Sequence, residues 1–192
     1  MNGELIMKKI VAFVGSAKHN GNIDSIVKKI LEGAEENELE TKIYYLNDMN
    51  IKGCQGCLYC RKHDTCCIKD DMQLVYEDIK SADIIIIGSP VYMCQVSAQT
   101  KLLLDRLYPL TEIDMGKHIP RFGEKQLIMV YSQAAPFKFM FSKYFRYLSK
   151  SLRGIGFKEV KRIVATKAFT PEVSRNNIKL MKNAYKIGKS LK

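Results

Sequence analysis

The sequence lacks the features that place a chain in a membrane or in a secretory pathway. None of its apolar runs approaches the roughly 18 residues of a membrane span. Residues 1–9 mix Glu, Lys and single apolar residues and contain no apolar core of a signal peptide. Repeats, low-complexity stretches and interior linkers are also missing. We therefore expect a single cytoplasmic domain over residues 1–192 that does not associate with membranes.

Acidic side chains are scarce in the last third of the chain. Residues 121–192 hold 17 Lys and Arg against 3 Asp and Glu, a net charge of +14. Residues 1–120 hold 14 Lys and Arg against 17 Asp and Glu, a net charge of −3, so the net charge of the whole chain is +11. A field of one sign attracts phosphates, acidic proteins, nucleic acid or anionic surfaces. A solvated, lysine-rich surface is the simplest interpretation.

Cysteine is concentrated in one short segment. Cys54, Cys57, Cys60 and Cys66 follow the spacing C-x2-C-x2-C-x5-C, and Cys67 comes directly afterwards. A chain of 192 residues can bury a core without disulfides. In a reducing compartment such a cluster is more typical of metal ligands or a redox site. This spacing lets one loop direct several thiolates at a single centre.

Strand-like and helix-like patterns alternate along the chain. Apolar or β-branched runs predict five strands, at about 9–14, 41–46, 84–87, 126–131 and 160–165. Helical periodicity or composition predicts intervening helices, at about 23–31, 72–79, 97–108, 137–152 and 171–191. Such alternation is typical of an α/β domain with a parallel sheet covered on both faces. In these folds ligands bind at the carboxyl ends of the strands, so the loops after the first four strands should hold the site.

Two of these loops have suggestive compositions. The segment 15–22, Gly-Ser-Ala-Lys-His-Asn-Gly-Asn, lies between a strand and a helix N-terminus, where backbone N–H groups and one cation suit a phosphate. It matches neither a Walker A loop nor G-x-G-x-x-G, which disfavours ATP and a dinucleotide bound in the usual way. The segment 88–93, Gly-Ser-Pro-Val-Tyr-Met, offers apolar and aromatic surface to a flat ring system.

Together these segments resemble the flavodoxin-like NAD(P)H-dependent FMN reductase family, in which G-S-x-R-x-x-G-N-[ST] holds the FMN phosphate and G-S-P-[VI]-Y lies against the flavin. The resemblance implies a doubly wound five-stranded sheet of order 2-1-3-4-5. Two positions depart from the motif, because Lys18 replaces Arg and Ile23 replaces Ser or Thr. The implied cofactor-binding residues are Ser16, Lys18, Asn22, Ile23, Pro90, Val91, Tyr92, Met93, Ser132 and Gln133.

The cysteine segment, at about 53–69, resembles the branch of that family called iron-sulfur flavoproteins. Asp70-Asp71-Met72 begins four residues after Cys66, the usual offset in the branch, and so implies Cys66 rather than Cys67 as fourth ligand. The implied metal ligands are Cys54, Cys57, Cys60 and Cys66, around a 4Fe-4S cluster. Zinc, and a cysteine loop that holds no metal, remain alternatives.

The resemblance implies an FMN-dependent oxidoreductase or electron-transfer flavoprotein. It would move electrons between NAD(P)H or ferredoxin and an acceptor such as a flavin, a quinone or an oxidant, through the cluster. One alternative is an FMN reductase without a cluster, and another is a non-enzymatic redox sensor or nucleic-acid-binding protein. We expect no nucleic-acid partner. Aromatic residues over more than one face of the helix at 137–152 indicate burial on one side and a subunit contact on another, with a core helix alone as the simpler interpretation, and we expect a homodimer or homotetramer.

Overall fold

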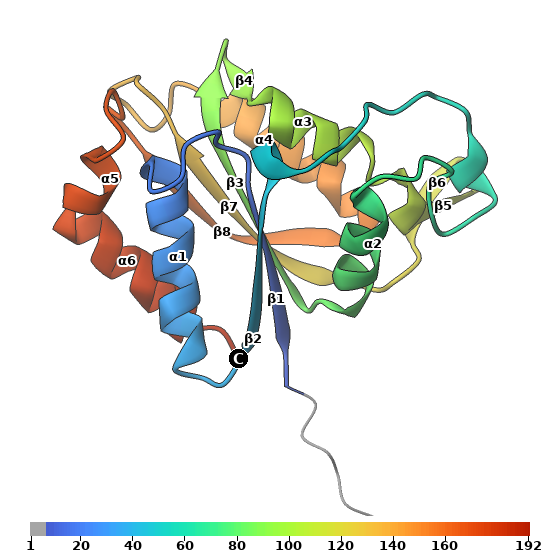
Figure 1. The fold of residues 1–192 in the computed structure, drawn as a ribbon, viewed down its shortest axis with the longest axis horizontal. Coiled ribbons are helices and arrows are strands. Elements are labelled where there is room, and N and C mark those ends of the chain that lie inside the picture. Colours follow the sequence, from blue (N-terminus) through green and yellow to red (C-terminus); the bar gives the residue numbers. More distant parts are fainter. Residues whose placement is uncertain (1–6) are drawn as a thin grey trace, which may run out of the picture.

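The computed structural model describes residues 7–192 and centres on a parallel sheet (Figure 1). The strand order is β2-β1-β3-β7-β8, which confirms the predicted 2-1-3-4-5 order for the five long strands. Their bounds are β1 Lys9–Val14, β2 Glu40–Tyr45, β3 Ile84–Tyr92, β7 Lys125–Ser132 and β8 Phe157–Ala165.

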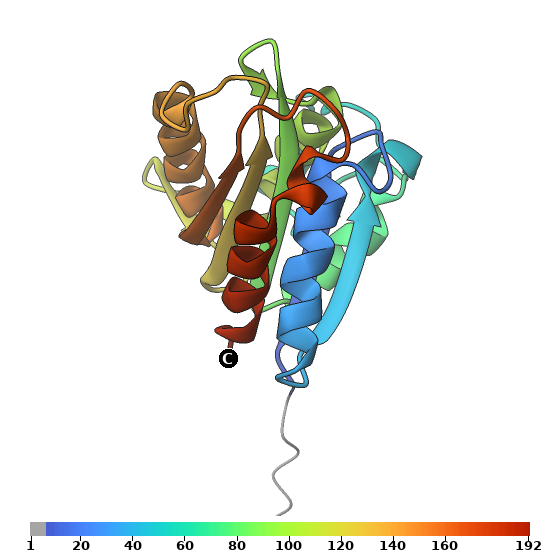
Figure 2. The same ribbon diagram turned by 90° about the vertical axis from the view of Figure 1, so that its left-hand side faces the viewer.

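Helices cover both faces of the sheet. One face carries α1 (Asn22–Glu35), the short α5 (Val173–Asn176) and α6 (Ile178–Lys189), and Figure 2 shows α1 and α6 side by side in front of the strands. The other face carries the helices α2 (Met72–Ser81), α3 (Ala98–Asp105) and α4 (Ser142–Leu152). The fold is therefore a three-layer, doubly wound sandwich.

The central strands are apolar throughout because both of their faces are covered. Alternate residues of β1 enter different cores: Ile10 and Ala12 pack with α1 and α6, whereas Val11 and Phe13 pack with α2, α3 and α4. The run Ile84–Ile87 of β3 is fully buried and pairs in register with β1. These two strands place the loops after them side by side at one edge of the sheet.

The structure differs from the predicted bounds in three helices of the chain's second half. The helix predicted from 137 starts at Ser142, because 137–141 turns sharply and the Gln133 Nε2 donates to Phe137 O at 2.9 Å. The closing helix is divided at Asn177, whose Oδ1 accepts from Leu180 N at 3.0 Å and caps α6. The helix predicted at 97–108 is shorter than expected.

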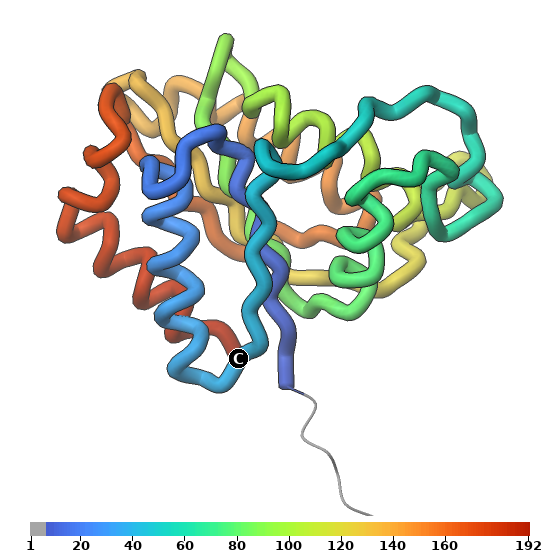
Figure 3. Tube along the Cα trace, viewed as in Figure 1, coloured from blue at the N-terminus to red at the C-terminus, as the bar shows by residue number. Residues whose placement is uncertain are grey.

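Three short strands lie outside the prediction. β4 (Gln95–Val96) folds back antiparallel on β3, and β5 (Thr111–Asp114) pairs with β6 (Lys117–Pro120) as a separate hairpin. The tube in Figure 3 shows the cysteine segment between β2 and α2 leaving the sheet and running out to this hairpin. Arg61 covers the Tyr108 ring at 5.6 Å there. Over 7–192, none of the helices is both long and apolar enough to cross a bilayer.

Candidate functional site

The first loop is fixed at its start by close backbone contacts. Gly15 N donates to Gly88 O at 2.8 Å, and the Ser97 hydroxyl, which also caps α3, donates to Gly15 O at 2.6 Å. A Cβ added at Gly15 would lie 1.8 Å from Thr100 Oγ1. This contact explains the glycine, because a side chain of any size would displace α3 from the loop.

The N-terminus of α1 borders a pocket and has no side-chain cap. Its N-cap residue is Gly21, and within residues 7–192 no side chain accepts a capping hydrogen bond there. The turn before it is held from below by the buried Asp24, which accepts from Asn20 N at 2.6 Å and from the Tyr45 hydroxyl at 3.0 Å. Uncapped N–H groups at a helix N-terminus favour an anion. The loop geometry is therefore set before any ligand arrives.

A pocket of about 250 Å³ lies at this helix end. It brings together eight of the ten predicted cofactor-binding residues: Ser16, Lys18, Asn22, Ile23, Pro90, Val91, Tyr92 and Ser132. The Lys18 side chain and the uncapped helix supply positive potential, while Tyr92 supplies an exposed ring. Phosphate at one end and a planar aromatic group at the other fit this lining.

The two remaining predicted residues do not line this pocket. Met93 and Cys94 have φ of 46° and 67° and form the two-residue turn between β3 and β4, and Met93 is 95 % exposed. Gln133 is buried and its Nε2 donates to Phe137 O, while its Oε1 has no hydrogen-bond partner among the described residues. Gln133 therefore shapes the turn after β7.

Asn22 lines the pocket but is held by the far end of the chain. Its Nδ2 donates to Thr170 O at 2.8 Å, and its Oδ1 accepts from Ser174 N at 2.8 Å. The Oδ1 atom and one N–H of Nδ2 are therefore engaged by the far end of the chain, which leaves the main-chain N–H and the second N–H of Nδ2 for a phosphate. The sequence motif identifies the position without revealing this bridging contact.

Sequence reasoning missed the loop after β8. Its residues Ala168, Phe169, Thr170 and Pro171 form one side of the pocket. No motif marks them, but their place after a fifth parallel strand would have identified the loop, since every such strand ends at the same edge. The exposed Phe169 adds a second aromatic side chain to the lining.

The cysteine segment is built differently, with most of its thiols exposed. Cys54 and Cys57 are exposed, Cys60 is half-buried and Cys66 is buried, and all six cysteines are free. Within residues 7–192, no three His, Cys, Asp or Glu side chains converge closely enough to hold a metal ion. The shortest thiol contact joins Cys57 to Cys67, with the two sulfurs 3.4 Å apart.

The thiols nevertheless influence one another's ionisation. Burial raises the pKa of the Cys60 thiol, and the neighbouring Cys66, Cys54 and Cys57 raise it further. A hydrogen bond from the Tyr59 backbone, with a second from Cys67, lowers the pKa of Cys57. The other three predicted ligands thus act on the ionisation of Cys60, and as thiolates the four cysteines would offer donor atoms of the kind that iron and zinc prefer.

A buried ion pair closes the base of the cysteine segment. Asp70 and Arg106 form a bidentate contact with distances of 2.7 and 3.0 Å, and their side chains are 0 % and 1 % exposed. Asp70 also accepts from Lys52 N at 2.9 Å, so it joins the two ends of the segment. Burial would raise the pKa of Asp70, but the Arg106 guanidinium and the Lys52 N–H outweigh it and hold the pKa below its usual value. Asp71 accepts from Asn50 N in the same way.

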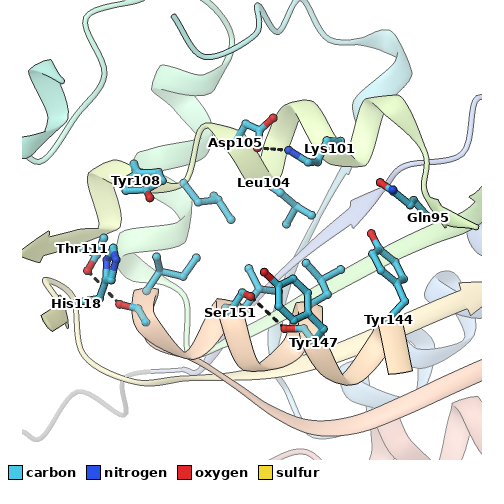
Figure 4. A pocket seen from close by; sticks show the side chains of 15 residues that line it. Gln95, Lys101, Leu104, Asp105, Tyr108, Thr111, His118, Tyr144, Tyr147 and Ser151 are labelled. Atoms are coloured by element: carbon cyan, nitrogen blue, oxygen red, sulfur yellow. Dashed lines mark hydrogen bonds and ion pairs between the residues drawn. The ribbon is translucent and has the colours of Figure 1, made fainter. Parts of the chain in front are cut away.

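A further groove lies away from these sites, between α3 and α4 (Figure 4). It encloses about 690 Å³ and is mainly apolar, with Tyr108 and His118 at one end and Gln95 and Tyr144 at the other. Phe145 of α4 is buried beneath it, whereas Tyr147 is 71 % exposed on its wall. The predicted second face of this aromatic helix is thus exposed.

Part of the C-terminal positive charge gathers on α6. A shallow groove of about 590 Å³ between α1 and α6 is lined by Arg175, Lys182, Lys186 and Lys189, with Tyr185 among them. Lys29 and Glu32 of α1 pair with each other across 2.8 Å on its rim. The surplus of cations on this face leaves it positive.

Comparison with known proteins adds sequence relatives that match about half of the chain. An iron-sulfur flavoprotein of Methanocaldococcus jannaschii is 39% identical over 102 residues, 53% of either chain. One from Methanosarcina thermophila is 39% identical over 98 residues, 51% of either chain. The matched region therefore spans about half the length of these curated relatives.

Solved structures match almost the whole fold at low identity. An NAD(P)H:quinone oxidoreductase from Methanothermobacter marburgensis superposes with a TM-score of 0.73 at 16% identity, covering 97% of this chain and 99% of its own. An azoreductase from Bacillus anthracis superposes with a TM-score of 0.73 at 10% identity, covering 96% of this chain and 100% of its own. An archaeal flavodoxin superposes with a TM-score of 0.56 at 13% identity, covering 95% of this chain and 94% of its own.

The family model described as NADPH-dependent FMN reductase matches residues 8–137. That span includes the first loop, the cysteine segment, the β3 loop and the turn after β7. With the flavodoxin-like sheet order and the pocket at the strand ends, it agrees with the resemblance found in the sequence. The chain belongs to the NADPH-dependent FMN reductase family.

Proposed function

We propose that this protein is an FMN-dependent oxidoreductase that binds FMN at the pocket between the first loop, the β3 loop and the loop after β8. The observation that carries the proposal is the uncapped N-terminus of α1 in a pocket that also contains Lys18 and Tyr92. This lining suits a phosphate joined to a planar ring.

The proposed roles follow from position. Ser16, Lys18 and the backbone of Asn22 and Ile23 hold the phosphate, where Ile23 offers a backbone N–H in place of the hydroxyl that the family motif supplies. Pro90, Val91 and Tyr92 contact the ring, and Ser132 lies beside them. Met93 and Gln133 are proposed to act through the loops they belong to, by shaping the β3–β4 turn and the turn after β7.

For the cysteine segment we propose a 4Fe-4S cluster held by Cys54, Cys57, Cys60 and Cys66. The donor chemistry supports it, as do the relatives that are named iron-sulfur flavoproteins. Bound FMN would accept a hydride from NAD(P)H and pass electrons on singly, and a cluster would relay them one at a time. The segment's base, fixed by Asp70 and Arg106, would keep the ligands close to the sheet edge.

The partners stay proposals as well. We propose NAD(P)H as donor and a small molecule such as a flavin or quinone as acceptor. The positive face of α6 would suit an acidic electron carrier such as ferredoxin, and raised salt should then slow that reaction alone. The predicted homodimer or homotetramer can be tested by analytical ultracentrifugation, which a monomer at all concentrations would contradict.

An FMN titration followed by fluorescence tests the cofactor. Lys18→Met should weaken binding about tenfold, because it removes one charge-assisted contact to the phosphate. Lys29→Met on the opposite side of α1 serves as the matched control and should leave the affinity unchanged. Riboflavin lacks the phosphate and serves as the reference ligand. If the wild type and the Lys18 variant both bind FMN and riboflavin with the same affinity, this pocket is excluded as the phosphate site.

A second candidate is an FMN reductase whose cysteine segment carries no cluster. It is favoured by one observation, that three metal ligands do not converge among residues 7–192. Protein purified without oxygen separates the two through its visible spectrum and its iron and sulfide content. Flavin bands with near-zero iron favour the reductase, whereas flavin with about four irons per chain favours the relay.

A further inference from the structure

The cysteine segment holds one more thiol than the proposed cluster needs. Cys67 is that thiol, and its sulfur lies 3.4 Å from the sulfur of Cys57, ten residues earlier. Both side chains are exposed, whereas Cys66, the neighbour of Cys67, is buried against the core. The extra thiol therefore faces one of the proposed ligands from the solvent side.

The backbone around Cys57 can move toward Cys67. A disulfide needs a sulfur separation of about 2.05 Å, so the two atoms must approach by about 1.4 Å. Cys57 lies between Gly56 and Leu58, both with φ of 62°, in a stretch without helix or strand. The space beside the Gly56 Cα is open to 4 Å. The loop is therefore free to close this gap without disturbing the sheet.

We propose that Cys57 and Cys67 form a reversible disulfide, and that this bond and the metal centre exclude each other. The exclusion rests on the proposed role of Cys57 as a ligand, since one sulfur cannot serve both. The oxidant is a low-molecular-weight disulfide such as oxidised glutathione. One cysteine thiolate attacks it and releases one glutathione, and the second thiol displaces the other, so two protein thiols become one disulfide and two glutathiones are reduced.

The closing of this bond converts the segment into a small ring of residues 57–67. Cys54, Cys60 and Cys66 remain, and three thiolates do not complete the four-cysteine set of a cubane. A dithiol reductant returns both thiols and restores the set. The segment then acts as a redox-controlled gate on cluster loading, located outside the FMN pocket.

The bond itself is tested on the metal-free full chain with oxidised glutathione. After free thiols are alkylated, tandem mass spectrometry of a tryptic digest should show a link between Cys57 and Cys67. Cys67→Ser should lose the link and retain glutathione on Cys57 as a mixed disulfide. Cys54→Ser is the matched control on the same exposed loop and should form the link as the wild type does. A link between a different cysteine pair in the wild type, or wild-type protein that carries only mixed disulfides with glutathione, would overturn the proposal.

The exclusion is tested by iron and sulfide uptake. Oxidised wild type should take up less than about a tenth of the iron that the reduced protein takes up, and dithiothreitol should restore full uptake. Equal uptake by the cross-linked and reduced proteins would refute the exclusion. If even the reduced protein takes up no iron, the cluster proposal fails and the exclusion fails with it. The mass spectra still show whether the disulfide between Cys57 and Cys67 forms.

Discussion

The proposed FMN pocket and the cysteine segment lie at the same edge of the sheet but are built by different means. The pocket is preassembled, because the Gly15 backbone and the side chains of Ser97 and Asn22 join its loops through short hydrogen bonds to backbone groups. The cysteine segment is fastened at its base by Asp70 and Asp71 and farther along by the Asp64–Lys80 ion pair, whereas three of its five thiols are exposed. One site is thus shaped by the protein alone, whereas the other would be shaped largely by what it binds.

Breaking the base of the cysteine segment should have the largest effect. Arg106→Met leaves the Asp70 carboxylate buried without its partner, which should lower the free energy of unfolding by about 3–5 kcal/mol. Lys101→Met on α3, the helix directly before Arg106, removes only an exposed contact to Asp105 and should cost less than about 0.5 kcal/mol. Urea unfolding followed by circular dichroism measures both, and similar losses would show that the base is not held by the buried pair.

The next largest effect should come from replacing one glycine of the pocket, and a glycine of the cysteine segment is the matched comparison. Gly15→Ala places a Cβ against Thr100 and should cost about 1–3 kcal/mol while weakening FMN binding. Gly53→Ala at the start of the cysteine segment meets only Leu102 at 3.7 Å and should be nearly neutral for both properties. Thermal unfolding with and without FMN provides the measurement. A tolerated alanine at Gly15 would contradict the preassembled pocket.

The helix that follows the cysteine segment is fastened to the sheet by charge, and this contact depends on pH. The Asp78 carboxylate of α2 forms ion pairs with Lys42 at 2.6 Å and Lys9 at 2.7 Å, and it accepts a hydrogen bond from the Tyr44 hydroxyl. Burial opposes ionisation, but these donors outweigh it and lower the pKa of Asp78 from 3.8 to about 2. The pKa of Asp78 is lower in the folded state than in the unfolded chain, so the ionised carboxylate stabilises the fold by about 2 kcal/mol. This contribution is present above about pH 4 and is lost as the pH falls toward about 2.

The variant Asp78→Asn isolates this contribution from those of other carboxylates. Its deficit in unfolding free energy relative to wild type should be largest near about pH 6 and should shrink as the pH falls toward about 2. Urea titrations at several pH values measure the deficit. A deficit that stays constant across this range would mean that the carboxylate's ionisation does not fasten α2.

The smallest effect concerns the turn beside the pocket. Met93 and Cys94 occupy left-handed positions that side chains rarely adopt, and Asn-Gly suits this hairpin turn better. Replacing the pair by Asn-Gly should stabilise the protein by about 1 kcal/mol and leave FMN affinity within about twofold. Met115→Asn in the remote β5–β6 turn, with φ of 46°, is the control. A marked loss of affinity in the first variant alone would show that Met93 contacts the ring.

The sequence predicted the pocket better than the cysteine segment for a physical reason. Strand order and the loops after β1 and β3 follow from local patterns, since apolar runs and strand ends determine them. The Asp70 and Arg106 contact joins residues 36 apart, and neither one carries a pattern that names the other. The loop after β8 was overlooked because the motifs end earlier, although the same rule of strand ends applies to it.

The hydrogen bonds of Asn22 have a consequence for the order in which the chain matures. They join the first helix to Thr170 and Ser174, 148 and 152 residues later. Contacts of such separation form late, because a long stretch of chain must be ordered first. A ribosome will therefore have released nearly all of the described residues before the pocket is complete. FMN capture is then a closing step of biogenesis, and an arrested nascent chain that ends before Thr170 should leave the flavin free in solution.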